Sequence, residues 1–223
     1  MLARALNGLA LAAAAAVASA CTVVGVREGT EEPGFTVLGL VNGTEIRRYG
    51  PRLAAEVTVV TPDEVAARNA GFRPLARYIF GANEGSARIA MTIPVAQAPA
   101  QGERIAMTAP VAQKVAPGGG WTIRFFMPSA YTRETLPKPK DPEVRIVALP
   151  EETVAVRRFR GAPGAAEVAA EKARLIEALA TGPWAPAGEP EAWFYDPPWT
   201  IPALRRNEVV VRVTPREPSQ PPA

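Results

Sequence analysis

The chain has 223 residues, of which 48% are hydrophobic and 21% are charged, and its formal net charge is +3. This length fits one or two globular domains, and the composition excludes a wholly disordered or fibrous protein. The sequence contains no histidine and a single cysteine. The chain alone therefore cannot build a Ser-His-Asp triad, a Cys-His dyad, a histidine-containing zinc site or a histidine-ligated haem.

The first 20 residues are typical of a secretory signal peptide. Arg4 precedes an apolar stretch from Ala5 to Val17, and small residues at 18 and 20 suit a signal peptidase. The stretch is shorter than the about 20 apolar residues that a membrane-spanning helix needs. We therefore expect residues 1–20 to be removed.

The single cysteine, Cys21, follows these small residues and resembles the acylated cysteine of bacterial lipoproteins. Ala18 stands where that motif usually has leucine, so cleavage before Cys21 without lipidation stays open as an alternative. The resemblance predicts a lipid anchor at Cys21, and Thr22 in place of aspartate favours the periplasmic face of the outer membrane. Without the lipid, the chain would be a soluble periplasmic or secreted protein.

The rest of the chain divides into a tether, one domain and a tail. Residues 21–34 are interpreted as a tether after the lipidated cysteine, residues 35–213 as one domain, and residues 214–223, which hold several prolines, as a disordered tail. The charges are dispersed without a block of one sign, so no nucleic-acid partner is predicted.

The first half of the domain predicts three strands and a helix. Strands are expected at 35–40 and 44–48, joined by a hairpin turn at Asn42-Gly43, and at 53–60. Asp63 is the expected cap of a helix that runs to about Phe80, with an interruption or bend at Gly71 and Pro74.

The second half predicts a similar order of elements. Strands are expected at 144–148 and 153–158 about a turn, then a helix at 162–180, then strands at 192–195 and 208–213. Glu171 and Arg174 have the spacing of an ion pair on that helix. The repeat predicts a pseudo-twofold α+β domain in which the sheet packs against two helices.

A shorter near-repeat lies between the two halves. Residues 88–95 and 104–111 both contain an Arg-Ile-Ala-Met-Thr-x-Pro-Val pattern, which predicts two adjacent strands of a hairpin.

Several motifs, in this order, resemble the SOUL haem-binding protein family over about residues 35–213. The segments that carry the resemblance are Glu45–Tyr49, Tyr78–Asn83, the two Met-Thr-x-Pro-Val repeats, Trp121 with Phe126–Ser129, Leu136–Pro139, Val156–Gly161, Tyr195–Trp199 and Arg205–Glu208. The resemblance implies a distorted antiparallel β-barrel flanked by two helices, a fold shared with effector-binding domains. It also implies reversible, non-catalytic binding of haem or another tetrapyrrole.

The resemblance places the tetrapyrrole against the first helix. It assigns an apolar contact to Phe72 and a propionate-binding role to Arg77, beside Tyr78; a second basic position falls on Asn69, so Arg68 or Arg73 is expected to replace it. Arginine suits this role because it binds carboxylates through two donors. Without histidine, the candidates for a weak axial ligand are the thioethers of Met91, Met107 and Met127 and the phenolate of Tyr78.

Other functions stay open at this point. The same fold could bind a different apolar small molecule, because fold does not determine the ligand. Carboxylates such as Glu45 and Glu56 have no spacing that predicts an active site, so no enzyme activity is expected. We expect Arg205–Glu208 to pair internally with acidic residues such as Glu191 or Asp196. No resident metal is predicted, and haem is expected as a ligand that folding does not require.

Overall fold

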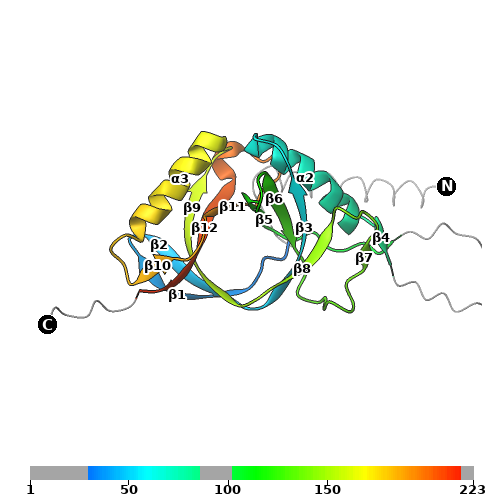
Figure 1. Ribbon diagram of the computed structural model, residues 1–223, viewed down its shortest axis with the longest axis horizontal. Helices are drawn as coiled ribbons and strands as arrows, with labels where there is room; N and C mark the ends of the chain where they lie inside the picture. The colour runs from blue at the N-terminus through cyan, green and yellow to red at the C-terminus, as the bar shows by residue number, and fades with distance from the viewer. Residues whose placement is uncertain (1–29, 86–101, 217–223) are drawn as a thin grey trace, which may run out of the picture.

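The computed structural model describes residues 30–85 and 102–216 (Figure 1). In this part of the chain, ten antiparallel strands form one large sheet, and two short strands form a second one. The elements in chain order are β1 Phe35–Val41, β2 Thr44–Tyr49, β3 Arg52–Val59, α2 Glu64–Ile79, β4 Asn83–Glu84, β5 Val111–Val115, β6 Trp121–Phe126, β7 Lys138–Pro139, β8 Arg145–Leu149, β9 Glu152–Arg160, α3 Ala165–Ala178, β10 Trp184–Pro186, β11 Glu191–Phe194, the 3-10 helix η1 Pro202–Leu204, and β12 Arg206–Pro215.

The sheet is strongly curved, and both helices lie on its outer side (Figure 1). Its strand order is β1-β2-β9-β12-β11-β5-β6-β3-β8. The predicted α+β class with two flanking helices is therefore confirmed. The strands β1 and β8 are the two edges of this path, and no pairing between described residues joins them into a closed barrel.

The predicted repeat is visible in the strand order. In each half, one strand is followed by a helix, a short strand and then two neighbouring strands of the large sheet: β3, α2, β4, β5 and β6, then β9, α3, β10, β11 and β12. The halves meet where β5 pairs with β11. The strands β8 and β9 follow one another in the chain but do not pair, because β8 joins β3 while β9 joins β2 and β12.

The hairpin of β1 and β2 turns at the predicted residues. Asn42 and Gly43 have positive φ angles of 48° and 76°, the left-handed conformation that a two-residue hairpin turn requires. The local sequence signal is thus sufficient to place this turn.

Helix α2 begins at the predicted cap. The Asp63 carboxylate accepts hydrogen bonds from the backbone N–H groups of Val65 and Ala66, at 2.8 and 3.0 Å. The predicted interruption is wrong, because Glu64–Ile79 is one continuous helix with Pro74 inside it. The helix tolerates Pro74 because Gly71, which has no side chain, lets it approach Ile123 of β6 closely and pack along the sheet.

Helix α3 lies within the predicted range but is shorter. Gly164 precedes its first residue, and the Glu167 side chain accepts a 2.8 Å hydrogen bond from the Gly164 N–H. The predicted ion pair of Glu171 with Arg174 is confirmed. Glu171 also accepts a 2.9 Å hydrogen bond from Arg157 of β9, which ties the helix to the sheet.

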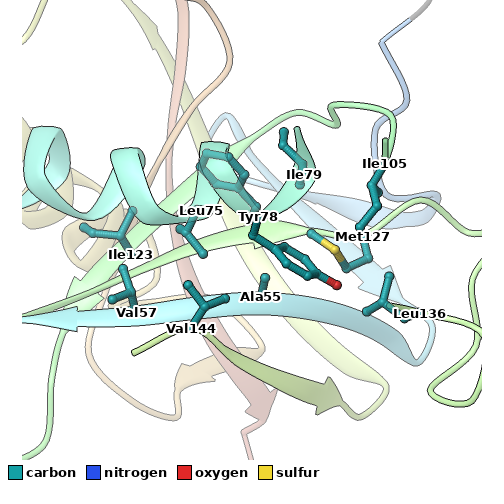
Figure 2. Packing of buried hydrophobic residues seen from close by; sticks show 11 residues of the cluster. Ala55, Val57, Leu75, Tyr78, Ile79, Ile105, Ile123, Met127, Leu136 and Val144 are labelled. Atoms are coloured by element: carbon teal, nitrogen blue, oxygen red, sulfur yellow. The ribbon is translucent and has the colours of Figure 1, made fainter. Parts of the chain in front are cut away.

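Three apolar clusters form the core. One lies between α2 and the outer face of β3 and β6, and Figure 2 shows its side chains, including Leu75 and Tyr78 from the helix and Val57 and Ile123 from the strands. A second lies between α3 and the sheet, around Leu175. The third fills the inner side of the curved sheet and consists of Tyr49, Ala54, Ala109, Ala112, Phe126, Val154, Val156, Trp193, Tyr195 and Val210.

The predicted hairpin of the two Met-Thr-x-Pro-Val repeats is wrong for the second repeat. The residues from 104 to 107 have no strand conformation, and β5 begins only at Val111. Contacts with distant segments hold these residues instead. The Ile105 N–H donates to the carbonyl of Ile79 at the end of α2, and the Thr108 hydroxyl donates to the Phe126 carbonyl. The first repeat lies outside the described residues.

Residues 30–34, in the segment interpreted as a tether, contact the sheet. The Glu31 carboxylate accepts a 2.8 Å hydrogen bond from the Ser129 N–H. The Glu32 carboxylate accepts hydrogen bonds of 3.1 and 3.0 Å from Arg206 of β12. Within the described residues, no helix is both long enough and apolar enough to cross a membrane.

Candidate functional site

An open groove of about 940 Å³ lies between the exposed side of α2 and the end of β3. Its volume falls in the range of small-molecule sites. Backbone geometry creates the groove, because α2 follows β3 directly and packs across it. The groove is lined by Val57, Thr58, Val59, Val60, Ala70, Phe72, Arg73, Pro74, Ala76, Arg77 and Glu143.

The walls of the groove are mainly apolar. Phe72 is exposed on α2, and its ring meets the ring of Phe125 on β6 edge-to-face, with centroids 5.2 Å apart. Val60 is among the most exposed apolar side chains of the described residues. The predicted apolar contact at Phe72 therefore lies in the groove.

Two arginines from α2 line the groove, one helical turn apart. Arg73 is exposed, and 68% of the Arg77 side chain is exposed. The Arg77 Nη2 atom lies 3.3 Å from a carboxylate oxygen of Asp141. Such an exposed ion pair contributes little to stability and can exchange for another carboxylate. The spacing allows both guanidinium groups to reach one ligand.

Tyr78 and Arg68 do not line the groove. Tyr78 points into the core, where its hydroxyl donates a 2.7 Å hydrogen bond to the Pro137 carbonyl (Figure 2). Burial raises the pKa of Tyr78, with a smaller contribution from Tyr131. The Arg68 guanidinium lies 4.0 Å from the ring centre of Phe194, and burial lowers its pKa. Both side chains therefore make contacts within the fold and do not face the groove.

The candidate iron ligands do not meet in the groove. Met127 is buried in the cluster beside Tyr78 (Figure 2), and Met107 is exposed but does not line the groove. Met91 lies outside the described residues, as does Cys21, the predicted lipidation site. Among the residues that the structure describes, no group of three or more acidic or cysteine side chains could hold a metal ion.

A second polar site, around the fully buried Glu208, joins three of the sequence motifs. The Glu208 carboxylate accepts hydrogen bonds from Arg47 of β2 at 3.0 and 3.2 Å, from Arg206 at 3.0 and 3.1 Å, and from the Tyr195 hydroxyl at 2.6 Å. Arg206 also donates its backbone N–H to Asp196. The Arg205–Glu208 segment thus pairs internally, but its contact with Asp196 runs through the backbone of Arg206, and the Arg206 side chain pairs with Glu208 and Glu32 instead of Asp196 or Glu191.

The pairing of Glu208 with Arg47 is not among the expectations from the sequence. A usable signal exists in the alternation of β2, because Glu45, Arg47 and Tyr49 share one face of that strand. That face turned out to be the inner face of the curved sheet. The cluster fills one part of the sheet interior with satisfied charges and leaves the groove on α2 as the open site.

A match to a protein-family model shows which family the chain belongs to. The model of the SOUL haem-binding proteins matches residues 30–101 and 96–212 of this chain. The chain belongs to the SOUL haem-binding family. The match spans both structural halves, including α2 and the groove.

Two kinds of relative support the family and the fold. Human heme-binding protein 2 is 33% identical over 123 residues, which are 52% of this chain and 52% of that protein, so this SOUL chain spans about half the length of the curated relative it matches. The C-terminal domain of EcmrR superimposes with a TM-score of 0.54 at 12% identity, over 78% of this chain and 98% of that domain. An EcmrR–DNA complex matches 78% of this chain with a TM-score of 0.53, at 11% identity and 57% coverage of its own chain.

Proposed function

We propose that this SOUL-family protein binds haem or a related tetrapyrrole in the groove on α2, without catalysing a reaction. The observation that carries the proposal is the pair of arginines, Arg73 and Arg77, which line an open apolar groove in a chain of this family. A tetrapyrrole such as haem is a flat apolar disc with carboxylate side chains. It requires this combination of an apolar wall and nearby cations.

Each groove residue has a distinct role in this proposal. Phe72 and the valines at the end of β3 contact the face of the disc and remove it from water. Arg73 and Arg77 bind the propionates through charge-assisted hydrogen bonds, with Arg77 exchanging Asp141 for the ligand. Glu143 lies at the same groove and repels anions, so the ligand is oriented with its carboxylates toward α2.

Iron ligation is not part of the proposed binding mode. The described lining contains no methionine, tyrosine or cysteine, and the chain has no histidine. When bound, haem supplies an iron-porphyrin whose redox and ligand-binding chemistry the groove residues do not tune through an axial bond. Iron-free protoporphyrin should therefore bind about as well as haemin.

We also propose that the protein acts in the cell envelope. The signal-peptide pattern of residues 1–20 and the resemblance of Cys21 to an acylated lipoprotein cysteine support attachment to the membrane through a lipid. Mass spectrometry of the protein extracted from its membrane tests this proposal. The expected result is a mature N-terminus at Cys21 with added acyl mass, and an unmodified Cys21 would contradict it.

Titration with haemin and with iron-free protoporphyrin, followed in the Soret region, tests the ligand. The experiment uses the chain from Thr22 to Ala223, which contains every described residue. We expect both ligands to bind with affinities within about threefold, because iron contributes no bond in the described groove. Binding of haemin alone would contradict this mode, and binding of neither would favour another apolar ligand on the same fold.

Substitution of the two arginines tests the site. The double variant Arg73→Gln/Arg77→Gln should bind haemin about tenfold more weakly or worse, because two charge-assisted contacts are lost. Arg133→Gln is the matched control, since Arg133 is exposed in another part of the chain. Unchanged affinity in the double variant, with unchanged thermal unfolding, would place the tetrapyrrole elsewhere.

A further inference from the structure

The loop between β11 and β12, residues 195–205, exposes apolar side chains and encloses its polar groups. Trp199, Ile201 and Leu204 are 64%, 45% and 41% exposed. Thr200, which lies between the first two, is fully buried. This is the reverse of the usual arrangement in a surface loop, where polar groups face water.

Hydrogen bonds within the loop fix this arrangement. At the base, the Asp196 carboxylate accepts a 2.7 Å hydrogen bond from the Arg206 N–H. Inside the loop, Arg205 donates to the Thr200 carbonyl at 2.7 Å and also to the Pro198 carbonyl. The single turn of η1 carries Leu204 at its end. The apolar side chains are therefore presented by an ordered loop rather than exposed by a lack of structure.

Two cations lie at the end of β9, which contacts η1. Arg160 is opposite Arg206 in the strand register, and Arg158 is opposite Glu208. Both arginines are exposed, and neither makes a hydrogen bond or an ion pair among the described residues. Their spacing of two residues puts them on the same face of the strand. Glu208 does not neutralise them, because its oxygens are bonded to Arg47, Arg206 and Tyr195.

We propose that this loop docks on an anionic lipid bilayer. Trp199, Ile201 and Leu204 enter the interfacial region, where tryptophan is favoured, and Arg158 and Arg160 contact lipid phosphates. The combination of an apolar contact with adjacent unpaired cations matches the chemistry of such a surface. A neutral protein surface would leave the two charges without partners.

The position at which the N-terminal segment joins the domain is consistent with a bilayer next to this loop. Glu32 contacts Arg206, the residue at which the loop rejoins the sheet. From Cys21 to Glu32 an extended chain spans at most about 40 Å, so an anchored protein would keep this loop close to the bilayer. This point depends on the lipid anchor proposed above, whereas the loop and its cations are independent of it.

Vesicle co-sedimentation of the chain from Thr22 to Ala223, which carries no lipid, tests the docking surface. One set of vesicles is phosphatidylcholine alone, and the other contains phosphatidylcholine and phosphatidylglycerol in equal parts. We expect binding to the mixed vesicles that weakens about tenfold in Trp199→Ser/Ile201→Ser and in Arg158→Gln/Arg160→Gln. Leu40→Ser and Arg133→Gln, which alter an apolar and a basic exposed residue elsewhere, should bind as the parent does.

Two results would overturn the proposal. One is the absence of parent binding to mixed vesicles, which would assign the loop to a protein partner instead. The other is equal binding of the parent and the Trp199→Ser/Ile201→Ser variant, with both shown to be folded by thermal unfolding. Haemin titration of the same variants separates this proposal from the groove, because docking variants should retain the parent affinity for haemin.

Discussion

Glu208 accepts hydrogen bonds from three other side chains, those of Arg47, Arg206 and Tyr195. Burial alone would raise its pKa, but the charges of Arg47 and Arg206, together with hydrogen bonds from Arg47 and Tyr195, outweigh burial and hold the pKa below its ordinary value of 4.5. The folded state thus favours the carboxylate. Such a buried and fully paired cluster has a net effect on stability that is small compared with the cost of removing one partner.

Substitution of this carboxylate tests that asymmetry. Glu208→Gln should lower the free energy of unfolding at pH 7 by about 3 kcal/mol, because the buried Arg47 and the partly buried Arg206 lose the carboxylate between them and keep only their outer partners, Glu45 and Glu32. Urea unfolding measures the change, and Glu151→Gln, at an exposed turn residue, should differ from the parent by less than about 0.5 kcal/mol. A loss below about 1 kcal/mol in Glu208→Gln would show that the arginines find other partners.

The same residue predicts part of the acid sensitivity of the fold. Because the folded-state pKa of Glu208 is lowered, its contribution is complete above the unfolded value of 4.5 and is lost as the pH falls toward the folded value. The parent should therefore lose stability below pH 4.5 more steeply than Glu208→Gln does. Parallel slopes of stability against pH in the two proteins would contradict this assignment.

At the scale of an element, α2 shows how packing overrides local propensity. Glycine and proline inside a helix predict an interruption, yet the helix is continuous. A methyl group at Gly71 would lie 2.8 Å from the Cβ of Ile123 and 3.2 Å from a methyl of Val57. The glycine therefore allows a close approach between α2 and the sheet at this position.

Gly71→Ala separates these two effects. Helix propensity alone would stabilise the alanine variant by about 1 kcal/mol, whereas overpacking against Ile123 should destabilise it by about 1–3 kcal/mol. We expect net destabilisation in urea unfolding. Gly50→Ala, at an exposed loop glycine where nothing lies near the added methyl, is the control and should change stability little. A stabilised Gly71→Ala variant would mean that the helix can move away from the sheet.

At the scale of the whole molecule, one edge of the large sheet is an exposed apolar strand, β1. Among the described residues β1 pairs with β2 alone, and its side chains Phe35, Val37, Leu38 and Leu40 are exposed without a charged residue among them. An apolar edge strand with free backbone groups can pair with another chain. The open strand path therefore leaves the fold with a surface that favours self-association at high concentration.

A charge on this edge tests the expectation. Leu40→Lys should leave the free energy of unfolding within about 0.5 kcal/mol of the parent, because Leu40 is 71% exposed. It should also reduce the light scattering that develops when concentrated protein is warmed below its unfolding transition. Val115→Lys, which charges an exposed valine away from β1, is the control. Equal scattering from the parent and Leu40→Lys would exclude β1 as the contact.

Local signals in the sequence determined the elements and the helix that carries the site. The Asn42-Gly43 turn, the Asp63 cap and the apolar periodicity of α2 act over a few residues, so they can be predicted without knowledge of the fold. The family resemblance, and not a local pattern, assigned Phe72, Arg73 and Arg77 to the ligand, and the structure places all three at one groove. The order of the family motifs along the chain predicted the fold that these elements form.

Only the tertiary structure decided which of the candidate residues are available to a ligand. Tyr78 is next to Arg77 in sequence, yet the helix turns it into the core, and Met127 joins it there. Glu208 meets Arg47 across strands that are distant in the chain. The physical reason is that burial and charge pairing depend on contacts between segments far apart in sequence, which local patterns do not specify.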